Sequence, residues 1–142
     1  MPSVSAATEI DRPPEIVFAA LADPLVRLSY DRATLRSVEQ LTPAPIGQGS
    51  RFRGDFRGLG MLEYEYTAFE PGRLIEQALQ LRVGRVRQRF QFRPSGRGTR
   101  LIQTITLQPN ILGRLLWSLL TRREMTRRAR TLNALVKQYV ER

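Results

Sequence analysis

The amino-acid sequence predicts an α+β fold in which a curved antiparallel sheet of about seven strands wraps around one long C-terminal helix. Three observations predict it. Short segments of alternating apolar and polar residues follow one another from residue 35 to residue 108, with turn residues between them. The last segment, residues 110–142, lacks proline and repeats apolar residues at steps of three and four. The length of 142 residues is typical of one domain, here expected to span residues 1–142.

The N-terminal part is expected to form a first strand and then one or two short helices. Residues 4–10 alternate in the manner of a strand. Asp11 is a suitable cap for a following helix, and Pro13 and Pro14 are tolerated in its first turn. Asp23 and Pro24 end that helix, because a residue before proline avoids the α region. Residues 25–30 then form a candidate second helix.

Six more strands are expected, and consecutive strands joined by short turns make an antiparallel meander. Their predicted ranges are 35–41, 50–57, 61–69, 74–82, 86–93 and 99–108. If Arg57 pairs with Met61, Phe52 lies opposite Tyr66 on the inner face of the sheet. The arginines that alternate with the apolar residues are expected on the outer, solvent face. These arginines include Arg53, Arg87 and Arg89.

The C-terminal segment is expected to form one helix from Asn110 to about Glu141, packed along the concave face of the sheet. Its middle is basic. A solvated face is favoured for these arginines over a patch for anionic lipid or nucleic acid. For nucleic acid, no stacking platform is evident, because the aromatic residues of the strands alternate away from the arginines. The basic residues are Arg122, Arg123, Arg127, Arg128 and Arg130.

Composition excludes several kinds of chemistry. The chain has no cysteine and no histidine, so disulfides, thiol catalysis, the usual zinc sites and histidine triads are ruled out. We therefore expect no metal, no cofactor and no catalytic residue. The formal net charge of +10 attracts anions at low salt. No apolar leader is visible, and the most apolar run, residues 111–120, is shorter than the about 20 residues of a spanning helix. A soluble, cytoplasmic protein is expected.

Four short segments carry a resemblance to a known family. They are the helix start and stop of residues 10–24, the GQGSRF of residues 47–52, the FEPGRL of residues 69–74 and the GTRL of residues 98–101. In this order the segments resemble the START-like or SRPBCC superfamily, and most of all its polyketide cyclase/dehydrase branch. The resemblance implies a helix-grip fold with a deep cavity for lipids, polyketides or other apolar molecules. The chain departs from many relatives in having no tryptophan after Asp23 and Pro24.

Side chains on the predicted inner face of the sheet, together with one helix residue, are the candidate binding site. A plain hydrophobic core explains each aromatic residue at least as well as a cavity wall. The glutamines favour a cavity, since a buried amide needs hydrogen-bonding partners, although a register slip would place them outside. The candidate ligand-binding residues are Phe52, Phe56, Tyr64, Tyr66, Gln77, Gln88, Phe90, Gln103 and Leu116.

Two functions remain open at this stage. The favoured one is binding or transport of a small hydrophobic ligand, such as a lipid, a polyketide or an aromatic compound, between the sheet and the C-terminal helix. The alternative is a cyclase or dehydratase that acts on such a ligand in the same cavity, because fold alone does not determine function. The expected partner is the small molecule, with no nucleic acid. Contact with a membrane surface is disfavoured, and the oligomeric state is left open.

Overall fold

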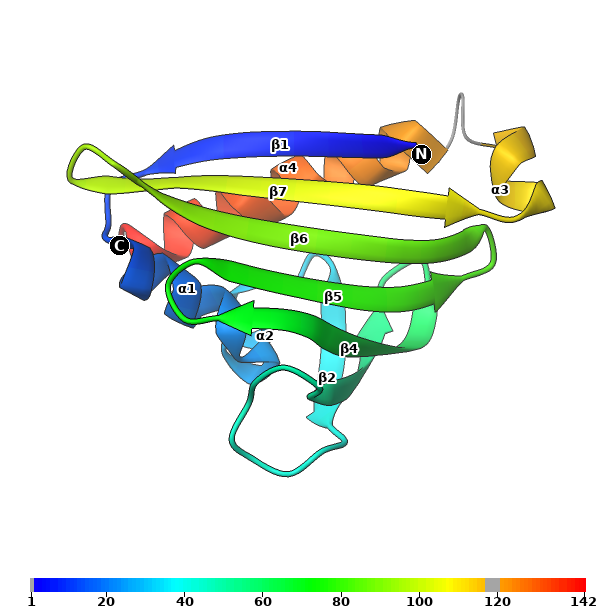
Figure 1. Cartoon of the computed structure of the whole chain (residues 1–142), viewed down its shortest axis with the longest axis horizontal. Coiled ribbons are helices and arrows are strands. Elements are labelled where there is room, and N and C mark those ends of the chain that lie inside the picture. The colour runs from blue at the N-terminus through cyan, green and yellow to red at the C-terminus, as the bar shows by residue number, and fades with distance from the viewer. Residues whose placement is uncertain (1, 117–120) are drawn as a thin grey trace.

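The computed structural model describes residues 2–116 and 121–142, and its centre is one antiparallel sheet of seven strands in the order β1-β7-β6-β5-β4-β3-β2 (Figure 1). Strands β2 to β7 follow one another as a meander, and β1 closes the order beside β7. The predicted antiparallel sheet is confirmed. The strands are β1 Ser3–Ile10, β2 Leu35–Gln40, β3 Arg51–Phe56, β4 Gly60–Glu70, β5 Leu74–Leu81, β6 Gly84–Ser95 and β7 Gly98–Pro109.

Four helices accompany the sheet: α1 Pro14–Ala22, α2 Pro24–Tyr30, α3 Ile111–Leu116 and α4 Arg122–Val140. Helix α4 runs behind β1 and β7, while α1 and α2 lie near the C-terminus and α3 lies at the opposite end of the sheet (Figure 1). The predicted helix-grip arrangement is therefore confirmed, including the second short helix. Helix α2 begins where the Asp23 carboxylate accepts a hydrogen bond of 2.9 Å from the Leu25 amide.

The prediction of one helix from Asn110 to about Glu141 is wrong for the described residues, because α3 and α4 are separate helices at different places on the sheet. Local contacts of α3 explain the difference. The Asn110 side chain accepts a hydrogen bond of 2.9 Å from the Gly113 amide. A Cβ atom at Gly113 would overlap the carbonyl oxygen of Val83, so glycine lets α3 dock on the turn between β5 and β6. Trp117 lies outside the described residues.

The predicted pairing of β3 with β4 is wrong by two residues. Phe52 pairs with Tyr64 instead of Tyr66, and Phe56 pairs with Gly60. Gly58 and Gly60 adopt φ angles of 80° and 84°, and these left-handed conformations let the chain reverse one residue earlier than expected. A shift by two residues preserves the face of every side chain, so the predicted inner and outer faces are kept.

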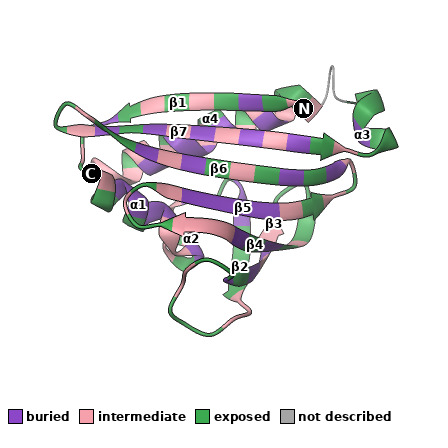
Figure 2. Ribbon diagram, in the orientation of Figure 1, coloured by how far each residue is buried: buried purple, intermediate pink, exposed green. Residues whose placement is uncertain are grey.

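Buried residues alternate with more exposed ones along the strands (Figure 2), and charged side chains occupy the outer face. Arg53 and Arg89 are 42% and 46% exposed and form ion pairs with Glu39 and Glu76. Arg87 is also exposed and pairs with Glu76. The prediction that these three arginines lie on the outer face is confirmed, so a ligand between the sheet and α4 does not meet them.

Candidate functional site

A cavity of about 80 Å³ lies between the inner face of the sheet and α4. Residues from the sheet, from α2 and from α4 enclose it, and most of the wall is aliphatic or aromatic. Four of the side chains are polar or charged: Arg27, Thr34, Gln88 and Arg128. The apolar lining residues are Phe56, Leu59, Leu62, Leu79, Leu81, Val86, Ile105, Met125 and Leu132.

A larger, open groove of about 650 Å³ adjoins this cavity at the end of the sheet where β3 turns into β4 and β5 turns into β6. Leu59, Leu62 and Leu81 line both spaces, so these three side chains form the boundary between them. Leu59 is 41% exposed and the neighbouring Met61 is 58% exposed. Apolar side chains therefore continue from the open groove to the cavity, with leucines at the boundary between the two spaces.

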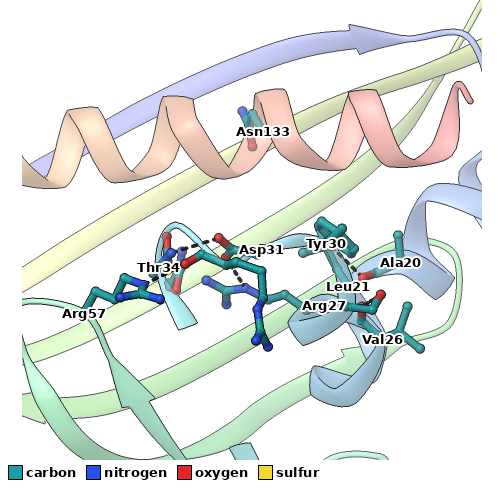
Figure 3. A network of polar contacts seen from close by, with 12 residues as sticks. Ala20, Leu21, Val26, Arg27, Tyr30, Asp31, Thr34, Arg57 and Asn133 are labelled. Carbon is teal, nitrogen blue, oxygen red and sulfur yellow. Dashed lines mark hydrogen bonds and ion pairs between the residues drawn. The ribbon is translucent and has the colours of Figure 1, made fainter. Parts of the chain in front are cut away.

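A buried ion pair lies beneath α4, and its cation, Arg27, lines the cavity (Figure 3). The Nε of Arg27 donates a hydrogen bond of 3.0 Å to one carboxylate oxygen of Asp31, and the other oxygen accepts one of 3.1 Å from the Thr34 amide. The Arg27 side chain is 9% exposed and the Asp31 side chain is fully buried. Asp31 has a partner on each oxygen, whereas both Nη groups of Arg27 donate no hydrogen bond to any residue within 2–116 or 121–142.

Amide side chains form a chain of hydrogen bonds across the inner face. Gln77 donates to Gln88 at 2.9 Å, and Gln88 donates to Gln103 at 2.5 Å. Gln103 then donates to the side chain of Asn133 at 2.9 Å and to the carbonyl oxygen of Ala129 at 3.1 Å, both on α4. This amide chain ties three strands of the sheet to α4, so the glutamines face inward and the alternative of a register slip is excluded.

Two of the tyrosines, Tyr30 and Tyr66, donate hydrogen bonds through their hydroxyl groups. The hydroxyl of Tyr66 donates to the Ala22 carbonyl at 2.9 Å, and that of Tyr30 donates to the Ala20 carbonyl at 2.7 Å. Burial raises the pKa of Tyr64 to about 12, against the opposing effect of the nearby Arg27 cation. Burial also raises the pKa values of Tyr30 and Tyr66 above the ordinary range. A phenolate is therefore disfavoured at neutral pH.

The sequence-predicted site residues are divided among four environments. Phe56 and Gln88 line the cavity, and Gln77 and Gln103 belong to the amide chain. Leu116 lies on α3, exposed, at the end of the sheet away from α1 and α2. The other four pack in the hydrophobic core, with the Phe52 and Tyr64 rings stacked at 5.3 Å: Phe52, Tyr64, Tyr66 and Phe90.

Sequence reasoning missed Arg27, Thr34 and the leucines of the cavity. The spacing of Arg27 and Asp31, four residues apart at the end of a predicted helix, was the available signal for an ion pair. That spacing also occurs in solvated pairs, so burial of the pair needed the structure. Among the described residues, no group of acidic side chains is arranged to hold a metal ion. No helix in the described ranges is both long and apolar enough to cross a membrane.

The fold and the cavity together define a helix-grip protein with an apolar interior space. A family model described as polyketide cyclase / dehydrase and lipid transport matches residues 1–141. The chain belongs to this family. No curated protein matches the sequence.

Solved structures with the same fold are numerous. The chain is similar to TTHA0849 from Thermus thermophilus, with 24% identity, a TM-score of 0.77 and coverage of 98% of this chain and 97% of the other. It is also similar to DR_A0006 from Deinococcus radiodurans, with 26% identity, a TM-score of 0.64 and coverage of 96% and 95%. For Ara h 8.0201 the identity is 11%, the TM-score 0.78 and the coverage 98% and 97%.

Proposed function

We propose that this protein binds a small hydrophobic molecule, such as a lipid, a polyketide or an aromatic compound, between the sheet and α4. The observation that carries the proposal is an apolar cavity under α4 that adjoins an open apolar groove through three shared leucines. Burying a ligand's apolar surface in such a space is favourable by about 25 cal/mol for each Å² removed from water. The family's description, which includes lipid transport, supports the proposal.

The volumes of the cavity and the groove determine how a ligand is divided between them. The inner cavity of about 80 Å³ is smaller than the about 300–1,000 Å³ of pockets that hold drug-sized ligands. The groove of about 650 Å³ is within that range but open to solvent. A ligand that reaches from the groove into the cavity must displace the side chains of Leu59, Leu62 and Leu81. We therefore expect one end of the ligand inside and the rest along the groove.

An enzyme of the cyclase or dehydratase type is the alternative on this fold. Such an enzyme needs a group that gives or takes a proton beside the substrate. The ionisable side chains in the cavity lining are Arg27 and Arg128, and a guanidinium group does not serve as a general acid or base. Burial raises the pKa of Tyr64 to about 12, so its hydroxyl stays protonated at neutral pH and does not accept a proton. These features favour binding without chemical change.

A fluorescence titration with fatty acids, sterols and polyketide-like aromatic dyes tests the proposal. We expect saturable binding of at least one class. Ile105→Phe, which places a larger side chain in the cavity wall, is expected to weaken that binding at least about fivefold. Ile102→Phe is the matched control, because Ile102 lies on the same strand with its side chain on the other face. Absence of saturable binding to every class, with the protein folded, would refute the proposal.

A further inference from the structure

The Arg27 guanidinium is buried in an apolar cavity with most of its hydrogen-bonding capacity unused. Its Nε binds Asp31, and both Nη groups are without a hydrogen-bonding partner in the described part of the chain. The Nη groups are not among the fully enclosed polar atoms that lack a partner, so they face the cavity space and gain from a guest that accepts their hydrogen bonds. The hydroxyl of Thr34, which also lines the cavity, donates no hydrogen bond to the described residues either. The structure thus places two donors with spare capacity beside one apolar space.

The charged residues of the cavity lining favour an anionic guest. The two charged residues of this lining are arginines, and Arg128 is already bound to Glu124 at 2.8 Å and to the Arg57 carbonyl oxygen at 2.6 Å. Arg27 is therefore the cation available to a guest. The net charge of +10 over the whole chain further favours an anionic guest over a cationic one.

We propose that Arg27, assisted by Thr34, receives the carboxylate of an amphiphilic acid whose apolar part extends past Leu59, Leu62 and Leu81 into the outer groove. This inference rests on the proposed function and names the class of ligand. A carboxylate is planar and accepts paired hydrogen bonds from a guanidinium, so it suits the two Nη groups. The inner cavity of about 80 Å³ accommodates a head group of this size but not the whole ligand. The groove takes the tail, which needs no polar partner.

Asp31 is a competitor in this arrangement. Its carboxylate balances the Arg27 charge while the cavity is empty, which keeps the buried cation from standing alone. When a ligand acid enters, its carboxylate and that of Asp31 both interact with the Arg27 cation, so the ligand gains less from this charge. Asp31 is therefore expected to weaken acid binding, although it stabilises the fold through the Thr34 amide and the Arg27 side chain.

The test compares cis-parinaric acid with its methyl ester by fluorescence titration at pH 7.5, where the free acid is ionised. The wild-type protein is expected to bind the acid at least about tenfold more tightly than the ester. Asp31→Asn keeps the cation and removes the competing charge, so it is expected to increase this preference. The double variant Arg27→Met, Asp31→Asn removes both charges without leaving one buried alone, and is expected to reduce the acid-to-ester ratio to about one.

Arg53→Gln is the control for net charge, because it removes one positive charge from the outer face of the sheet. Its acid-to-ester ratio is expected to equal that of the wild type. Equal binding of acid and ester by the wild-type protein would overturn the inference and leave the proposed function intact. A preference for the acid that persists in the double variant would overturn it as well, since the recognition would lie elsewhere. Binding of neither probe by the folded protein would overturn the inference, and the proposed function would fall with it if sterols and aromatic dyes also failed to bind.

Discussion

Replacing Gln103 with methionine removes the centre of the amide chain while keeping the length of the side chain. Gln103 is fully buried, accepts from Gln88 and donates to Asn133 and the Ala129 carbonyl oxygen. The change leaves the Gln88 amide and the Asn133 carbonyl oxygen without these partners. An unsatisfied buried group costs about 1–3 kcal/mol, so two of them minus a gain of about 1 kcal/mol for the apolar sulfide predict a loss of about 1–5 kcal/mol.

Urea unfolding followed by circular dichroism measures this loss directly. A destabilisation of about 1–5 kcal/mol is substantial against the about 5–15 kcal/mol that keeps a domain folded, and corresponds to a decrease in Tm of roughly 4–20 °C. Gln108→Met on the same strand is the control, because Gln108 is exposed, and its effect is expected within about 0.5 kcal/mol. A loss below about 1 kcal/mol for Gln103→Met would refute the role assigned to the amide chain.

Three other predictions concern the fold and the cavity. Gly98→Ala places a Cβ against the Ile10 carbonyl oxygen and is expected to lower the free energy of unfolding by about 2 kcal/mol or more. In the same urea assay, Gly47→Ala, which has open space around it, is expected to change the free energy of unfolding by less than about 0.5 kcal/mol. Leu132→Ala removes a buried wall of the cavity and is expected to cost about 2–5 kcal/mol, while the larger space increases the affinity for bulky aromatic dyes; an unchanged affinity in dye titration would contradict the position of the cavity. Because burial raises the pKa of Tyr64 in the folded state from 10.0 to about 12, its contribution to stability is complete below pH 10 and is lost as the pH rises toward 12. At pH 11, while both proteins are folded, the wild type and Tyr64→Phe should therefore have the same absorbance at 295 nm. An excess of phenolate in the folded wild type would contradict the burial of Tyr64.

Much of the fold follows from local patterns in the sequence. Alternation within each strand determines which side chains share a face, so the inward glutamines and the outward arginines were predictable. The short turns determine that consecutive strands pair. The pairing of β3 with β4 was missed because it depends on left-handed conformations at Gly58 and Gly60, which sequence alone does not specify. The alternation of residues predicts which face of the sheet each side chain occupies, but the pairing register of two strands depends on the geometry of the turn between them.

The division between α3 and α4 was missed for a different reason. The leucines of residues 112–116 have helical spacing whether or not the helix continues, so periodicity could not separate one helix from two. The close approach of Gly113 to Val83 is a tertiary contact. The same limit applies to the site, because the position of Arg27 inside the cavity depends on how α2 packs beneath α4. Cavity volume depends on side-chain packing at sub-ångström scale and has no local signature.

The central claim is that a hydrophobic ligand enters the space between the sheet and α4, and methyl NMR tests it most directly. Protein labelled at isoleucine, leucine and valine methyl groups is titrated with a saturated fatty acid. We expect saturable shifts at methyl groups of the cavity wall, such as Leu79, Ile105 and Leu132. Little change is expected at Val17 and Leu21, which belong to α1 and lie in the hydrophobic core. Shifts confined to exposed Ile111 and Leu115 would show adhesion to the surface and would contradict the account.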